Sequence, residues 1–171
     1  MGQEIVHVML KPDTLEFGMR DVILSELLGL GGKLVAAKRL VLSLAQISEI
    51  YFDFGNERAK KAVFYYFTTR ETEHLAFIGE LGIHQKYQQA KGKPGKGGIR
   101  GKYYTRYTQL TPEEIADWFN GTLANIEDID LEMFARDILH VPNSVEKSKR
   151  GLSVVLGSDQ IQLIESLGIK F

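Results

Sequence analysis

The sequence contains no cysteine, and this absence removes several classes of chemistry at once. Without a thiol the chain can form no disulfide, no thiolate metal site and no cysteine nucleophile. Proteins without disulfides are typical of a reducing compartment, so we expect a cytoplasmic protein.

Long apolar segments are also missing. No apolar run reaches the roughly 18 residues that a membrane-spanning helix needs, and the charges spread over residues 4–20 argue against a signal peptide. The 21 basic and 22 acidic side chains nearly cancel, which argues against a protein that coats nucleic acid through bulk charge. We therefore expect no membrane association and no stable nucleic-acid partner.

What remains is the composition of an ordinary globular protein, with 44% hydrophobic and 25% charged residues. The length of 171 residues indicates a single domain, residues 1–171. Strands are expected at 5–10, 34–42, 73–79, 138–141 and 152–156, and helices at 19–30, 44–51, 57–67, 80–90, 144–150 and 158–167. Strands that are partly joined by helices and partly close together in the chain favour an α+β sheet with helices on one face.

Charge is sorted by sign in the second half of the chain, although the net charge is only −1. Residues 86–106 carry basic side chains, five glycines and no acid, whereas residues 107–134 carry acids and no base. Within the acidic segment, Thr111-Pro112-Glu113-Glu114 combines a capping residue, a proline at the first helical position and acids in the first turn. We expect the acidic segment to fold as a helical subdomain beside the basic one.

Three stretches of the sequence indicate function more specifically than composition does. They are Val8-Met9-Leu10-Lys11-Pro12-Asp13 followed by Gly18, then Gly95 to Gly101 with Ile99-Arg100, and finally Ile138-Leu139-His140 leading into Asn143-Ser144-Val145-Glu146. In this order they resemble signature stretches of the nucleoside diphosphate kinase family, and Gly31 to Leu42 resembles the second strand of that family. The resemblance covers residues 1–50, weakens at 55–91, resumes at 92–101 and returns at 138–156.

This resemblance implies a ferredoxin-like βαββαβ fold with an antiparallel sheet. It also implies a ping-pong reaction in which the γ-phosphate of a nucleoside triphosphate passes to a nucleoside diphosphate through a phosphohistidine. ATP and other nucleoside di- and triphosphates would be the partners, Mg²⁺ would sit on their phosphates rather than in a metal site of the protein, and the chain would form a homo-oligomer. Arg100 and His140 lie 40 residues apart, further than in the family, which indicates an insertion at about residues 103–132.

The residue types at the matching positions suit this chemistry. His140 ends an apolar strand and would be the phosphoryl acceptor, because an imidazole with an ordinary pKa of about 6.5 offers a free nitrogen lone pair at neutral pH. Lys11 and Arg100 match the phosphate and sugar contacts of the family and would supply the positive charge that phosphoryl transfer needs. Tyr51 matches the tyrosine that lies beside the active histidine.

Other nucleotide-binding positions depart from the family. Asp137 stands three residues before the histidine, where the family has an asparagine that contacts the sugar. A carboxylate can accept a hydrogen bond from a hydroxyl but adds negative charge near phosphate. Phe64 is nearest to the position of the base-stacking phenylalanine. An arginine and a threonine of the family have no counterpart, and the cations available in their place are Lys86, Lys91 and Lys93.

The pair that orients the active histidine is missing as well. The family holds the second nitrogen of its histidine with a glutamate, which is itself bonded by a serine. This sequence has Gly151 and Pro142 at those positions. We expect His140 to donate instead to a backbone carbonyl, to Asn143 or to a carboxylate from elsewhere, with Asp137 as one candidate.

The remaining histidines have no place in the resemblance. His7 and His74 fall within strand patterns and are expected to be half-buried structural groups. His84 is expected at the surface.

Two other functions are compatible with the sequence. The chain could be a regulatory relative of the same fold with weakened catalysis, but the joint presence of His140, Lys11 and Arg100 argues against this. Basic and aromatic residues also alternate at 96–107, as they do on platforms that bind single-stranded RNA. The near-neutral net charge and the acidic segment that follows argue against an RNA-binding module.

Overall fold

The fold is described from a computed structural model, which defines residues 2–51, 57–93, 96–103 and 136–169 together with residues 117 and 120. The insertion expected at about 103–132 and the helix start at 111–114 lie outside these residues, apart from Tyr103, Asp117 and Asn120. Among the helices of the described ranges, none is long and apolar enough to cross a membrane.

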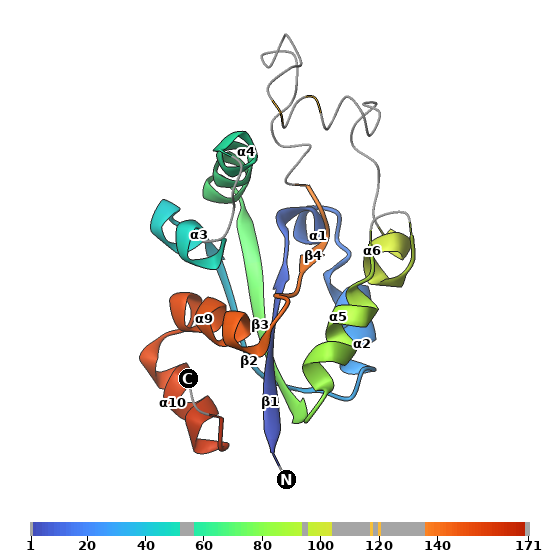
Figure 1. Cartoon of the computed structure of the whole chain (residues 1–171), viewed down its shortest axis with the longest axis vertical. Helices are drawn as coiled ribbons and strands as arrows, with labels where there is room; N and C mark the ends of the chain where they lie inside the picture. Colours follow the sequence, from blue (N-terminus) through green and yellow to red (C-terminus); the bar gives the residue numbers. More distant parts are fainter. Residues whose placement is uncertain are drawn as a thin grey trace.

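Four strands form one antiparallel sheet (Figure 1). They are β1 (Gln3–Leu10), β2 (Lys33–Val41), β3 (Glu71–Glu80) and β4 (Leu139–His140), in the spatial order β2-β3-β1-β4. Helix α2 (Arg20–Leu28) joins β1 to β2, and helix α5 (Ile83–Lys91) lies between β3 and β4. This strand order and these two helices are the ferredoxin-like βαββαβ arrangement, so the expected α+β fold class is confirmed.

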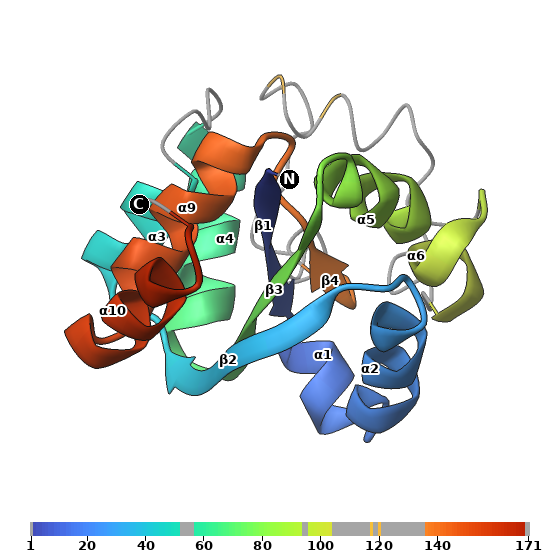
Figure 2. The same ribbon diagram turned by 90° about the horizontal axis from the view of Figure 1, so that it is seen from below.

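Both faces of the sheet are apolar, and helices cover both of them (Figure 2). Successive residues of β1 point to opposite faces, so that Ile5 and Met9 join one core while Val6 and Val8 join the other. Helices α2, α5 and α6 (Gly98–Tyr103) lie on the second of these faces. The first face is covered by α3 (Leu44–Ile50), α4 (Glu57–Thr68), α9 (Val145–Val155) and α10 (Ser158–Ser166).

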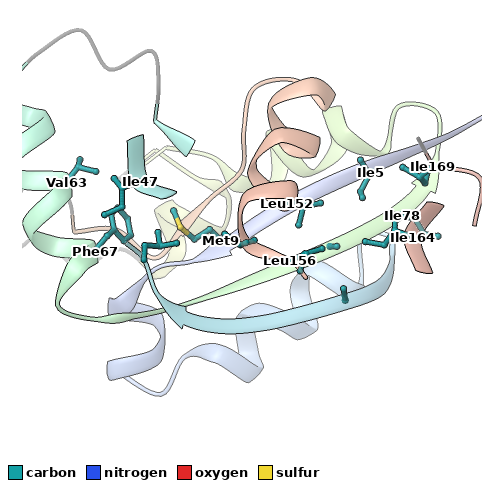
Figure 3. Close-up of a cluster of buried hydrophobic side chains, with 14 of the residues drawn as sticks. Ile5, Met9, Ile47, Val63, Phe67, Ile78, Leu152, Leu156, Ile164 and Ile169 are labelled. Atoms are coloured by element: carbon teal, nitrogen blue, oxygen red, sulfur yellow. The ribbon is translucent and has the colours of Figure 1, made fainter. Parts of the chain in front are cut away.

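The expectation that helices cover one face of the sheet is therefore correct for α2 and α5, but other helices cover the second face as well. A central strand that is buried on both sides needs a covering layer on each side, because neither apolar face can be left in water. Figure 3 shows Ile47, Phe67, Leu152 and Ile164 from the four additional helices gathered on this face.

Two local elements differ from the sequence prediction. The turn expected at Pro12 is the start of a short helix, α1 (Pro12–Glu16), with the proline in its first turn. The strand expected at 152–156 does not exist, because α9 continues to Val155. Leu152 and Val155 lie on one face of this helix and are buried in the core, and this packing outweighs the β propensity of the valines.

Glu73 is a buried carboxylate on β3 that ties the sheet to α2. It accepts two hydrogen bonds of 2.7 Å from Arg20 and one of 3.3 Å from Arg39. Burial by itself would raise the pKa of Glu73. The hydrogen bonds and charge of Arg20, together with those of Arg39, outweigh this and hold the pKa below its ordinary value.

Glu73→Gln is expected to lower the free energy of unfolding at pH 7 by about 1–3 kcal/mol, because it leaves the arginines without their counter-charge. A carboxylate with a lowered folded pKa stabilises the fold above its unfolded pKa, about 4.3, and loses this effect as it becomes protonated. The difference between variant and wild type should therefore shrink as the pH falls. Urea unfolding at pH 7 and below pH 4 measures it, and an equal difference at both would contradict the assignment.

Candidate active site

The end of β1 and the edge strand β4 bring the three sequence motifs together. Met9 lies opposite His140 in the β1–β4 register, so Lys11 and His7, two residues to either side of Met9, are the diagonal neighbours of His140 on the same face. The backbone N–H of Lys11 donates to the carbonyl of Ile138 at 3.0 Å, which extends the pairing beyond the end of β1. The first and third motifs therefore meet through strand pairing.

Side chains from α5 and α6 hold the outer edge of β4. Nε of Arg100 donates to the carbonyl of Leu139 at 3.1 Å, and Nζ of Lys91 donates to the carbonyl of Val141 at 3.2 Å. Gln88 donates to the same Val141 carbonyl at 2.7 Å. The carbonyls on both sides of His140 are thus fixed, and the cations that fix them lie beside the imidazole.

A cavity of about 310 Å³ opens at this point. Its lining residues are Ile50, Tyr51, Lys91, Arg100, His140, Val141, Pro142, Asn143 and Lys147. Three of these side chains are basic and none is acidic. A concave site with this charge suits an anionic ligand such as a phosphate group.

His140 lies in the cavity as a neutral imidazole. Its ring packs against Tyr51 with centroids 5.3 Å apart. Burial, and then the positive charge of Lys11 and further basic groups around it, hold the pKa of His140 well below its ordinary value. The ring therefore keeps a free lone pair at neutral pH, as a nucleophile requires.

Lys11 is a buried cation next to this histidine. Burial lowers the pKa of Lys11 to about 8, against the opposing effect of Asp137. The Lys11 ammonium lies 5.7 Å from the centroid of Phe67, and that ring stacks on Tyr51 at 5.8 Å. With a pKa of about 8, Lys11 is still mostly charged at neutral pH. An anion bound beside it would raise this pKa.

Asp137, which stands where the resemblance places an asparagine, contacts two cations and the backbone of the protein itself. Its carboxylate pairs with the guanidinium of Arg100, lies 4.0 Å from Nζ of Lys11, and accepts the N–H of Ile138 at 2.8 Å. Asp137 therefore compensates the two cations and anchors the start of β4. A phosphate that binds Arg100 must compete with this carboxylate.

Three expected nucleotide-binding residues lie outside this group. Phe64 is half-buried on α4 with the ammonium of Lys60 over its ring, and it does not line the cavity. Lys86 lines a different cavity, at the start of β1 with Gln3. Lys93 is exposed on the loop that follows α5.

Lys91 and Lys147 occupy the cavity instead. In the sequence, Lys91 stands out only as one of several available cations near the expected helix end at residue 90. Extending α5 by one residue, to Lys91, places this side chain beside β4. Lys147 was missed because it is one of several basic residues in the first turns of α9, and only the fold shows which of them faces the cavity.

The other histidines are more buried than expected. His84 is not at the surface: its Nε2 lies 3.1 Å from Oγ of Ser148 on α9, and its backbone N–H donates to Glu4 on β1. His7 and His74 are fully buried rather than half-buried, and they are hydrogen-bonded to each other. His7 and His74 have lost all contact with bulk water, and His84 keeps only a little.

The expected substitutes for the orienting pair are not engaged. Among the residues that the structure describes, no hydrogen-bond partner is found for either ring nitrogen of His140. Asp137 is committed to Arg100, and Asn143 is exposed. At Gly151, a Cβ atom would lie 2.5 Å from Nδ1 of His7, so the space where a side chain would begin is filled by that imidazole.

No protein-family model matches the sequence, and no curated protein matches it. Similar folds are found among solved structures. One is a transition-state mimic of the nucleoside-diphosphate kinase from Borrelia burgdorferi with bound vanadate and ADP, which has a TM-score of 0.68 and 15% identity over 92% of this chain and 89% of that one. Another is an NDP kinase from Pyrobaculum aerophilum, with a TM-score of 0.67 and 17% identity over 93% of this chain and 98% of that one.

The nucleoside diphosphate kinase from Aquifex aeolicus is similar in the same way, with a TM-score of 0.64 and 14% identity over 93% of this chain and 99% of that one. At these identities the likeness concerns the fold. The chain therefore has the fold of the nucleoside diphosphate kinases.

Proposed function

We propose that this protein is a nucleoside diphosphate kinase that transfers the γ-phosphate of a nucleoside triphosphate to a nucleoside diphosphate through a phosphohistidine at His140. The observation that carries the proposal is the position of a neutral imidazole in a cavity with basic walls, at the point where three motifs meet. The similarity of the fold to kinases with this activity supports it, and one of those structures holds vanadate and ADP.

In this reaction the lone pair of a His140 nitrogen attacks the γ-phosphorus, and the bond from phosphorus to the bridging oxygen breaks. The nucleoside diphosphate leaves with the electron pair of that bond. Lys11 and Arg100 neutralise the charge that spreads over the phosphoryl oxygens, and Lys91 and Lys147 add to the positive potential of the cavity. A second nucleoside diphosphate then takes the phosphoryl group from His140 in the reverse sequence of steps.

Tyr51 holds the ring of His140 by packing against it. Burial raises the pKa of Tyr51, so its hydroxyl stays protonated throughout the neutral range.

Mg²⁺ belongs to the substrate in this proposal. In the described ranges no group of three His, Cys, Asp or Glu side chains is placed to hold a metal ion. The cation would arrive on the phosphates of the nucleotide, where it shields charge during transfer.

The test is a labelling experiment. Incubation with γ-labelled ATP and magnesium should leave one label on the chain, stable in base and labile in acid, and addition of a nucleoside diphosphate should remove it as the triphosphate. Absence of label under these conditions would contradict the proposal and would favour the regulatory relative.

The RNA-binding alternative loses support from the contacts of α6. The structure describes residues 96–103 of the basic aromatic segment. Within them, Lys102 and the hydroxyl of Tyr103 both bond to Glu26 at 2.5 Å, and Ile99 is buried. These side chains pack α6 against α2, and they offer no stacking platform for bases.

The pH dependence of kcat/KM follows from the two shifted groups. Because the pKa of His140 is well below 6.5, activity should not fall as the pH drops from 7 toward 6. Because the pKa of Lys11 is about 8, activity should decline as the pH rises through that value and Lys11 loses its charge. Lys11→Arg should move this alkaline limb to higher pH, since arginine keeps its charge. An unchanged limb in the variant would rule out Lys11 as its source.

A further inference from the structure

A chain of buried polar groups crosses the sheet next to His140. Nε2 of His7 lies 2.9 Å from Nδ1 of His74, and Nε2 of His74 lies 2.9 Å from Oγ1 of Thr72. The hydroxyl of Thr72 donates to the carbonyl of Leu40 at 3.1 Å. His7, His74 and Thr72 are all fully buried, so this chain runs through the interior from β2 through β3 to β1.

One arrangement of protons makes all three hydrogen bonds of this chain at once. Because a carbonyl can only accept, Thr72 then donates its single proton to Leu40 and accepts from Nε2 of His74. Nδ1 of His74 is then a lone pair, which accepts the proton on Nε2 of His7. It follows that Nδ1 of His7 carries a lone pair and is fixed as an acceptor.

That acceptor has no donor among the described residues. Nδ1 of His7 is buried and makes no hydrogen bond there, which is costly for a polar atom. A neutral His140 has one ring N–H to donate, and it too lacks a partner in the described part of the chain. The two residues are diagonal neighbours across β1 and β4, roughly 7–8 Å apart at Cα. Their rings are not hydrogen-bonded to each other in the structure, so the His140 side chain would have to rotate for the bond to form.

Gly151 makes room for this arrangement. A Cβ at residue 151 would lie 2.5 Å from Nδ1 of His7 and 2.9 Å from its Cε1. The imidazole of His7 therefore fills the space in which a side chain on α9 would start. The missing glutamate and the presence of His7 are two aspects of one packing arrangement.

We propose that His7 is the positioning residue for His140: when the His140 side chain rotates toward β1, Nδ1 of His7 accepts the N–H of one His140 nitrogen and so leaves the other as the lone pair that attacks phosphorus. This inference rests on the proposed function of His140 as phosphoryl acceptor. The relay from Leu40 through Thr72 and His74 fixes His7 in the tautomer that can accept.

The electrostatics of the relay agree with this role. Burial lowers the pKa of His7 to about 3 and that of His74 well below its ordinary value, so each ring carries a single proton at neutral pH. A neutral acceptor orients the nucleophile but gives a phosphohistidine less electrostatic support than a carboxylate. Turnover should accordingly be lower than with a glutamate in this role.

Two substitutions of His7 separate its role as acceptor for His140 from its hydrogen bond to His74. In His7→Asn, the side-chain oxygen takes the place of Nδ1, so the acceptor for His140 is kept while the link to His74 is lost. In His7→Gln, the terminal amide takes the place of Nε2, so the link to His74 is kept while the acceptor is lost. His84→Gln removes a buried imidazole elsewhere and is the matched control.

The readout is the isomer of phosphohistidine, identified by NMR on the labelled and digested chain. Wild type, His7→Asn and His84→Gln should give a single isomer, whereas His7→Gln should give both, with kcat lowered roughly 10- to 100-fold and KM changed less. A single isomer in all four proteins would overturn the proposal, whatever their thermal stability.

A second measurement separates this inference from the proposed function. NMR of ¹⁵N-histidine protein without nucleotide reports which His140 nitrogen carries the proton, and His7→Gln should mix the two tautomers. A mixed tautomer in that variant without any phosphorylation of wild type would support the positioning role and contradict the kinase. Phosphorylation of wild type with an unchanged tautomer in His7→Gln would do the opposite.

The double variant His7→Ala/Gly151→Glu completes the design. It removes the imidazole that fills the space beside residue 151 and supplies a carboxylate in its place. It should recover the single isomer and raise kcat above that of His7→Ala. Gly151→Glu alone should fail to do so, because its Cβ meets His7. Equal activity in His7→Ala and the double variant would count against His7 and residue 151 sharing one orienting task.

Discussion

His140→Ala is expected to abolish both the phosphoenzyme and transfer to a second nucleotide, with kcat falling by roughly 10⁴-fold or more. In a ping-pong reaction through a covalent intermediate, no neighbouring group can replace the nucleophile. The only imidazole on the adjoining strand that faces the same side, His7, is committed to His74 through Nε2. The measurement is label retained from γ-labelled ATP, together with the rate of nucleoside triphosphate formation.

The variant should remain folded, which makes the result interpretable. His140 is partly exposed on a two-residue edge strand, and its ring contact with Tyr51 is a small part of the core. A thermal midpoint close to that of wild type is therefore the control. Undiminished label in a folded His140→Ala would contradict the assignment of the nucleophile.

The sequence predicted those elements whose patterns are local. The apolar run along β1 and the proline that follows it locate the central strand and its end to within two residues. The Ile138-Leu139-His140 motif also predicts β4, although this strand has only two residues. Because pairing of β1 with β4 follows from the fold class, the meeting of Lys11 and His140 was also predictable.

Features that depend on packing between distant segments could not be read from the sequence. Helix α9 overrides a local strand signal because its apolar face fits the core beside β1. Gly151 looks like a simple loss of a functional side chain, and only the fold shows that His7 needs the space. The depth of His84 depends in the same way on Ser148, 64 residues away.

Arg100→Ala is expected to lower kcat/KM by roughly 100-fold or more, since loss of one donor that stabilises transition-state charge has effects of this size. Two changes act together. The phosphoryl oxygens lose a cation, and the buried carboxylate of Asp137 loses its guanidinium partner and repels the phosphates instead. Lys102→Ala on the same helix is the matched control, because Lys102 is exposed and bonds to Glu26. A change of less than about threefold in Arg100→Ala would indicate a solvated loop residue.

The contribution of Asp137 can be separated from that of the lost cation. Adding Asp137→Asn to Arg100→Ala removes the repulsion but not the missing donor, so the double variant should recover part of the activity and no more. Arg100 also holds the Leu139 carbonyl through Nε, and a displaced β4 would appear as a lower thermal midpoint in both variants. If the double variant is no more active than Arg100→Ala at an equal midpoint, the carboxylate of Asp137 does not reach the phosphates, and the whole loss belongs to the guanidinium.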